Sequence, residues 1–172
     1  GLRIGKTSIV ISPLKALMDQ LNDRLNSKGL RSYVFHSGIE YKKQYSIISN
    51  LFKEGNPHFI FLSPERLSFD GYLEYILKLN TEKIGLVVID EAHCISQWGY
   101  SFRPFYKNIP DFLNNTFTNK WPTLLSLTAT LNPKDLTEIQ NDFNISNIIK
   151  SRSLLRKNIT IKFEQLGSEE EK

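Results

Sequence analysis

Cysteine and methionine are nearly absent from this chain, and long apolar runs are missing altogether. Each of the two sulfur-containing residue types occurs once in 172 residues. The lone cysteine, Cys94, excludes an internal disulfide framework and a multi-cysteine metal site, and it fits a reducing compartment such as the cytoplasm or the nucleus. No apolar run is long enough to cross a bilayer, and no signal-peptide pattern is present, so a membrane partner is not expected.

The charge balance is basic, with 22 Lys and Arg against 18 Asp and Glu and a formal net charge of +4. Such a balance suits a polyanionic partner without requiring one, because many basic proteins bind no nucleic acid. Hydrophobic residues make up 40% of the chain and charged residues 23%, as in ordinary globular proteins. The length is enough for one domain with a sizeable core.

Two adjacent acids, Asp90 and Glu91, follow the short apolar run Leu86-Val87-Val88-Ile89. A β-branched run of this length predicts a strand buried on both faces of a parallel sheet, and open α/β sheets hold their ligands at the carboxyl ends of the strands. Mg²⁺ prefers oxygen ligands and binds through one or two carboxylates together with water and substrate phosphates. Asp90 is therefore a candidate metal ligand, acting through water, and Glu91 is a candidate for orienting or deprotonating an attacking water. The alternative is an exposed acidic pair without a function.

Predicted strands alternate with predicted helices throughout, which indicates an α/β fold with a mostly parallel sheet and helices on both faces. The apolar runs place strands near residues 8–11, 31–35, 58–62, 86–89, 123–127 and 145–149. Two strands are followed by Ser-Pro, at Ser12-Pro13 and Ser63-Pro64. Serine is a favoured N-cap and proline suits the first helical position, so a capped α-helix is predicted after each. Helix N-termini attract phosphate, although simple capping explains the pattern equally well.

The segment behind the acids contains Trp98, Phe102 and Arg103. Both aromatic rings can stack on bases of any sequence, at about 1–3 kcal/mol each. The arginine can pair with a phosphate or a carboxylate through two hydrogen bonds. Packing in the core is the alternative, but the polar neighbours Ser96 and Gln97 favour an exposed, DNA-sensing loop.

Asp90-Glu91-Ala92-His93 spells DEAH, which resembles the Walker B box of superfamily 2 helicases. The continuation from Cys94 to Gly99, followed by Phe102-Arg103-Pro104, resembles the aromatic-rich loop of RecQ-family DNA helicases. A joined match over about twenty residues is far more specific than a four-letter box. The chain has WGYSFRPFY where the family usually has WGHDFRPEY, so the departures are at positions 100, 101 and 105.

Three further segments match the same family in order. The sequences SPL and SPERL resemble motifs Ia and Ib, which implies contacts to single-stranded DNA by Ser12, Pro13, Leu14, Ser63, Glu65 and Arg66. The sequence LTAT at 127–130 resembles motif III. The resemblance implies catalytic roles for Asp90, Glu91 and His93, and coupling of nucleotide state to DNA by Gln97, Thr128 and Thr130, with threonine hydroxyls bonding to His93.

The resemblance implies a RecA-like lobe of a P-loop NTPase that uses ATP and Mg²⁺ to unwind DNA in the 3′→5′ direction, with single-stranded and duplex DNA as partners. Residues 1–150 would be part of the first motor domain, and residues 151–172 an exit segment toward a second RecA-like lobe. Gly5-Lys6-Thr7 does not qualify as the Walker A loop, because Gly1 and Gly5 enclose three residues instead of four and a strand follows. We therefore expect that loop before Gly1, and expect the isolated fragment to be inactive.

Two other interpretations stay open. The chain can belong to a DEAH translocase of a defence or restriction system, or to an RNA helicase. It can also be a non-catalytic module that binds nucleic acid, although intact Asp90, Glu91 and His93 argue against this. A Mg²⁺-dependent nuclease is a weaker possibility, because no further cluster of acids is evident for a second metal ion.

Overall fold

The computed structural model describes residues 5–68, 71–95, 104–129, 132–151, 158–160 and 162. Within these ranges the chain forms one parallel sheet of five strands in the order β2-β3-β1-β4-β5. The strands are β1 (Thr7–Ile11), β2 (Ser32–Phe35), β3 (Phe59–Leu62), β4 (Ile84–Ile89) and β5 (Thr123–Ser126). The predicted α/β class with a parallel sheet is confirmed.

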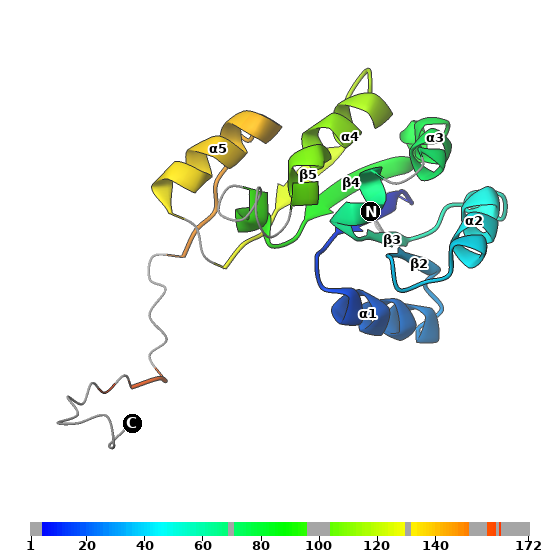
Figure 1. Ribbon diagram of the computed structural model, residues 1–172, viewed down its shortest axis with the longest axis horizontal. Helices are drawn as coiled ribbons and strands as arrows, with labels where there is room; N and C mark the ends of the chain where they lie inside the picture. The colour runs from blue at the N-terminus through cyan, green and yellow to red at the C-terminus, as the bar shows by residue number, and fades with distance from the viewer. Residues whose placement is uncertain are drawn as a thin grey trace.

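The helices lie on both faces of the sheet (Figure 1). They are α1 (Lys15–Ser27), α2 (Tyr41–Asn50), α3 (Tyr72–Lys78), α4 (Ile109–Thr116) and α5 (Pro133–Phe143). The connection from β1 to β2 crosses the sheet in one direction, and the connections from β2 to β3, from β3 to β4 and from β4 to β5 cross it in the other. Because such crossovers are right-handed, α1 lies on one face of the sheet, and α2, α3 and α4 lie on the other. No helix in the described ranges is long and apolar enough to span a membrane.

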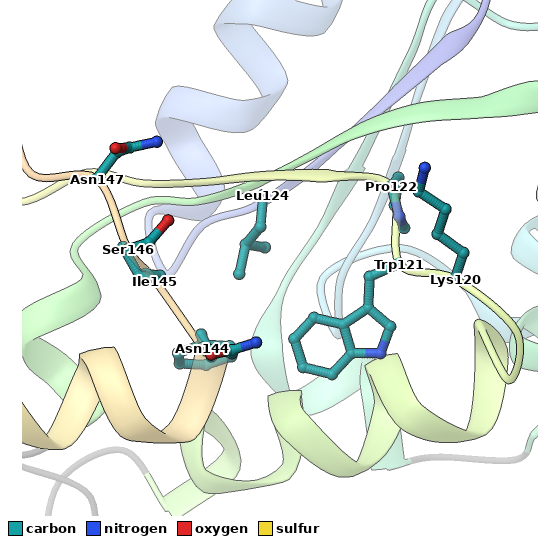
Figure 2. Close-up of a pocket in the computed structure, with 9 residues that line it drawn as sticks. Lys120, Trp121, Pro122, Leu124, Asn144, Ile145, Ser146 and Asn147 are labelled. Atoms are coloured by element: carbon teal, nitrogen blue, oxygen red, sulfur yellow. The ribbon is translucent and has the colours of Figure 1, made fainter.

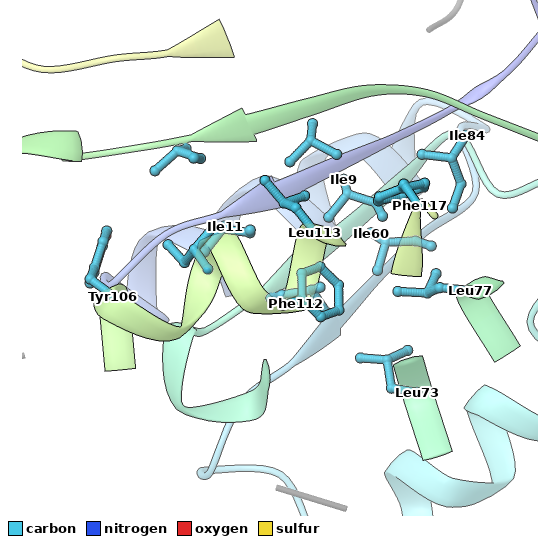
Figure 3. Close-up of a cluster of buried hydrophobic side chains, with 14 of the residues drawn as sticks. Ile9, Ile11, Ile60, Leu73, Leu77, Ile84, Tyr106, Phe112, Leu113 and Phe117 are labelled. Atoms are coloured by element: carbon cyan, nitrogen blue, oxygen red, sulfur yellow. The ribbon is translucent and has the colours of Figure 1, made fainter. Parts of the chain in front are cut away.

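The main hydrophobic core fills the space between the sheet and α3 and α4. Alternate strand residues such as Ile9, Ile60 and Val87 point into it and are fully buried. Figure 3 shows side chains of β1 facing Phe112 and Leu113 of α4. This core anchors the middle strands, and so it sets the positions of the residues that follow their carboxyl ends.

The opposite face is covered less completely toward β5. Phe61, Val10, Val88 and Leu125 are register partners in four neighbouring strands. Phe61 is 4% exposed, but Leu125 at the sheet edge is 44% exposed. A parallel sheet is normally covered on both faces. Within the described residues, this face of β5 and its outer edge are left open.

The two predicted serine N-caps are wrong. Helix α1 starts after Leu14 with no side-chain cap, and the Ser12 hydroxyl donates instead to the Asp90 carboxylate. After Ser63 the chain forms a 3₁₀ helix, Pro64–Ser68, in place of an α-helix. The buried Ser63 hydroxyl finds no hydrogen-bond partner within the described part of the chain. A contact that is distant in sequence therefore replaced the local cap at Ser12.

The predicted strand at 145–149 is also wrong. The chain leaves α5 through Asn144, in a left-handed conformation, and continues without regular structure to Ser151. Ile149 is fully exposed. An apolar run becomes a strand only where a neighbouring strand takes up its backbone hydrogen bonds, and none of the described strands lies alongside this segment.

Candidate functional site

Asp90 is held at the carboxyl end of β4 by hydrogen bonds of its backbone and by two hydrogen bonds to its carboxylate. Its backbone N–H donates to the carbonyl of Ile11 at 2.9 Å, which extends the pairing of β4 with β1. The Ser12 hydroxyl donates to Oδ2 at 2.9 Å, and the Glu91 N–H donates to Oδ1 at 3.1 Å. The carboxylate is thus oriented before any ligand arrives, and it lies at the edge of the sheet that the sequence predicted.

Glu91 has a left-handed backbone conformation, with φ of +51°. A residue other than glycine costs roughly 1–3 kcal/mol there, and such strain is concentrated at functional sites. The conformation turns the chain sharply off β4 into the 3₁₀ helix Ala92–Ile95. It leaves the Glu91 carboxylate partly exposed, with Oε2 at 3.3 Å from Nδ1 of His93.

His93 joins the acids to the end of β5. Its Nδ1 lies 3.0 Å from the Thr128 hydroxyl, as well as beside Glu91. Two backbone bonds hold the segments together: Ala92 N–H donates to the Leu127 carbonyl at 2.9 Å, and Leu127 N–H donates to the Ile89 carbonyl at 2.8 Å. The predicted contact between His93 and a threonine hydroxyl is present at Thr128.

Tyr106 is a residue that the sequence analysis did not assign to the site. It is fully buried, and its hydroxyl donates to the backbone carbonyl of Asp90 at 2.8 Å. It lies in the 3₁₀ helix Pro104–Asn108, which follows the aromatic-rich segment. The next residue, Lys107, forms an ion pair with Glu138 of α5. The exit of the aromatic-rich segment is therefore attached both to the acids and to α5. No sequence signal identified the acceptor of its hydroxyl.

The six predicted contacts to DNA divide by exposure. Leu14 is 44% exposed, and Pro13 and Glu65 are half-buried. Ser12, Ser63 and Arg66 are buried. The structure brings all six to the same edge of the sheet, because they follow β1 and β3, which pair directly.

Five other predicted residues lie outside the described part of the chain. They are the DNA-stacking and phosphate-pairing candidates Trp98, Phe102 and Arg103, and the coupling candidates Gln97 and Thr130. Their assignments remain predictions.

The side chains present suit Mg²⁺ better than a metal held wholly by protein. The described residues contain no group of three or more His, Cys, Asp or Glu arranged to hold a metal ion. Asp90 and Glu91 offer hard oxygen ligands at one point, which fits an ion that takes its remaining ligands from water and phosphate. Thr7 is no part of a phosphate loop, because it is buried in β1 and its hydroxyl donates to the Pro57 carbonyl at 2.7 Å.

A hollow of about 530 Å³ lies at the opposite, amino-terminal end of β5. Figure 2 shows Trp121 and Leu124 of one segment across from Asn144 and Ile145, which follow α5. The acids follow the carboxyl end of β4, which runs parallel to β5, so this hollow is separate from them.

The acids follow β4 at the carboxyl edge of a parallel sheet, which is the edge where open α/β sheets hold their ligands. Comparison with known families gives a direct assignment. The sequence profile described as "DEAD/DEAH box helicase" matches residues 2–139. The chain belongs to the DEAD/DEAH box helicase family. Asp90 to His93 are the four residues from which this helicase family takes its name.

Relatives of this helicase chain confirm the resemblance to RecQ. It is 37% identical over 158 residues to the "ATP-dependent DNA helicase RecQ" of Bacillus subtilis, an alignment that covers 91% of this chain and 26% of that protein. It is 31% identical over 174 residues to the "Probable ATP-dependent DNA helicase RecS" of the same organism, covering 100% of this chain and 33% of the relative. It is 30% identical over 145 residues to the "RecQ-like DNA helicase blm-1" of Caenorhabditis elegans, an alignment that covers 81% of this chain and 14% of that protein. The chain thus spans a third or less of the length of these relatives.

Proposed function

We propose that this chain is part of the first motor domain of an ATP-dependent 3′→5′ DNA helicase of RecQ type. The observation that carries the proposal is the oriented Asp90 carboxylate beside Glu91 at one edge of the sheet, with Nδ1 of His93 at 3.3 Å from Glu91 and 3.0 Å from the Thr128 hydroxyl. The names of the relatives support DNA as the nucleic acid and ATP as the fuel. The basic net charge of +4 is compatible with both polyanions.

Each residue of the edge has a chemical part in this proposal. Bound ATP with Mg²⁺ supplies the phosphoryl group that is transferred to water. Asp90, oriented by Ser12, would hold the metal. Glu91 orients the attacking water and accepts its proton. His93 lies against both Glu91 and Thr128, so a change in the position of the carboxylate is passed to the end of β5.

DNA is sensed, in this proposal, by residues on both sides of the acids. Trp98, Phe102 and Arg103 contact the single strand, and Gln97 and Thr130 take part in coupling it to hydrolysis. Tyr106 adds a direct route, because its hydroxyl bonds to the carbonyl of Asp90. A movement of the aromatic-rich segment would therefore pull on the acid at the end of β4.

We propose that the phosphate-binding loop comes from a further segment that lies along β5. The outer edge of β5 is open among the described residues, and Leu125 and Leu127 are exposed beside it. An open apolar strand edge is an unfavourable surface that proteins normally cover. An added strand and helix would cover both the edge and the face, and would place a phosphate loop next to Asp90. We expect the 172-residue chain by itself to hydrolyse no ATP, because a lysine and hydroxyl that hold the phosphates are needed.

The test is the ATPase rate of the complete helicase with single-stranded DNA and with RNA of equal length. We expect stimulation by DNA, and loss of at least about a hundredfold in the rate in Glu91→Gln, which keeps the shape but removes the base. Equal rates for Glu91→Gln and the unchanged protein would support a non-catalytic binding module instead. Stimulation by RNA alone would support an RNA helicase.

A further inference from the structure

A group of exposed tyrosines lies at the start of α2, outside the site described above. Tyr41 and Tyr45 are 45% and 46% exposed. Together with Lys42 and Ser46 they line a hollow of about 570 Å³, and we call these four residues the tyrosine surface. Exposed hydrophobic side chains that gather in one patch mark binding sites, whereas singly exposed ones are ordinary.

The rings of the tyrosine surface are held in place by neighbouring elements. Tyr45 stacks on Tyr72 of α3, with ring centroids 4.4 Å apart and planes 17° apart. The guanidinium of the buried Arg66 lies 5.9 Å from the centre of the Tyr41 ring. The two rings of α2 are themselves 6.4 Å apart. A surface that is rigid before binding loses little conformational entropy when a ligand stacks on it.

The tyrosine surface continues the edge of the sheet on which the acids lie. Tyr41 begins α2 a few residues after the carboxyl end of β2. The Lys15 amino group donates to the Ser37 hydroxyl at 2.6 Å, so the start of α1 meets the loop between β2 and α2. Leu14, Lys15 and Ser37 are exposed. They form a strip that leads from the predicted DNA contact at Leu14 toward Tyr41.

The charges along this strip favour a polyanion. Lys15, Lys42 and Lys43 are exposed. The acids beside them are the exposed Glu40, the half-buried Glu65, and Asp19, whose carboxylate lies 3.0 Å from Nε2 of His36. Exposed aromatic rings alternating with cations are the combination that binds single-stranded nucleic acid irrespective of its sequence, because rings stack on bases and cations contact the phosphates.

We propose that the tyrosine surface binds bases of single-stranded DNA and extends the contact at Leu14 by several nucleotides. This inference rests on the proposed DNA-binding function, and it adds a place where the strand lies after it leaves the acid edge. Tyr41 and Tyr45 stack on bases of the strand, and Lys15 and Lys42 contact its phosphates.

The experiment measures binding of fluorescently labelled oligo(dT) to the chain by anisotropy, with oligonucleotides of about 6 and about 20 nucleotides, near and above the site size of one small domain. For Tyr41→Ala combined with Tyr45→Ala we expect the affinity for the long oligonucleotide to fall at least about tenfold, and the affinity for the short one to change less than about twofold. The double change to Phe keeps the rings and should bind as the unchanged chain does. Tyr75→Ala is the matched control, since Tyr75 lies on α3, is 57% exposed and lines no part of the hollow.

Four outcomes would overturn the inference. Unchanged affinity of the double alanine variant for the long oligonucleotide, with weaker binding in Leu14→Glu, would exclude the tyrosine surface but leave the proposed function intact. An equal loss of affinity for both lengths would show a general folding defect. Single Tyr41→Ala, which leaves the stack of Tyr45 on Tyr72, must then weaken binding of the long oligonucleotide and not of the short one, and an unchanged affinity in that variant would overturn the inference. Failure of the unchanged chain to bind either oligonucleotide would remove both the inference and its basis. Binding of an apolar peptide at the tyrosine surface in place of DNA would indicate a protein partner.

Discussion

The hydrogen bond from Tyr106 to Asp90 gives the sharpest single prediction. Tyr106→Phe removes the hydroxyl that donates to the Asp90 carbonyl at 2.8 Å but keeps a ring that is fully buried. No cavity forms, so the packing contribution stays while the hydrogen bond to Asp90 is lost. Leaving a partly buried acceptor without its donor costs about 1–3 kcal/mol. We expect the free energy of unfolding of the chain to fall by about 1–2 kcal/mol.

Urea denaturation followed by circular dichroism measures this change as a lower midpoint with an unchanged slope. Tyr75→Phe is the matched control, because it is the same chemical change at a 57% exposed ring, and it should alter the free energy of unfolding by less than about 0.5 kcal/mol. In the complete helicase, Tyr106→Phe should lower the DNA-stimulated ATPase rate more than the rate without DNA. If Tyr106→Phe leaves both the free energy of unfolding and the stimulation of the ATPase rate by DNA unchanged, the proposed link between Tyr106 and Asp90 is refuted.

Three further predictions concern the acid edge. Ser12→Ala removes the donor to Asp90 Oδ2, and we expect a weaker apparent affinity for Mg²⁺ in the ATPase assay, by a few fold; an unchanged affinity would show that Ser12 does not orient the carboxylate. Glu91→Gly relieves the backbone strain at φ of +51°. We expect the variant chain to unfold at a temperature no lower than that of the unchanged chain, and the complete helicase with this change to lose its ATPase activity. A markedly lower unfolding temperature would show that the conformation is not strained. His93→Ala and Thr128→Val, made singly and together, should have non-additive effects on the logarithm of the DNA-stimulated ATPase rate, because Nδ1 of His93 lies 3.0 Å from the Thr128 hydroxyl. Additive effects would mean that this contact carries no coupling.

Much of the fold was predictable because local patterns coincide with tertiary requirements. The β-branched run before Asp90 became β4, in the middle of the sheet, and the acids follow its carboxyl end as expected. The serine at residue 12 has the pattern of a helix cap, but helix α1 starts after Leu14 and the Ser12 hydroxyl donates to a carboxylate 78 residues away, a contact that no local pattern specifies.

Other features depend on neighbours that a local pattern does not specify. The apolar run at 145–149 has the composition of a strand, but no described strand lies beside it. Tyr106 is buried, and no pattern in the sequence contains information about which carbonyl its hydroxyl meets. The contact of His93 with Thr128 was predictable only through the family resemblance, because the two residues are 35 positions apart.

The most direct test of the central claim is a crystal structure of the complete helicase with Mg²⁺, a non-hydrolysable ATP analogue and single-stranded DNA. The account predicts the metal and the terminal phosphate beside Asp90 and Glu91, with the DNA crossing Leu14 at the same edge of the sheet. Nucleotide bound elsewhere, for example in the hollow beside Trp121 at the other end of β5, would contradict it.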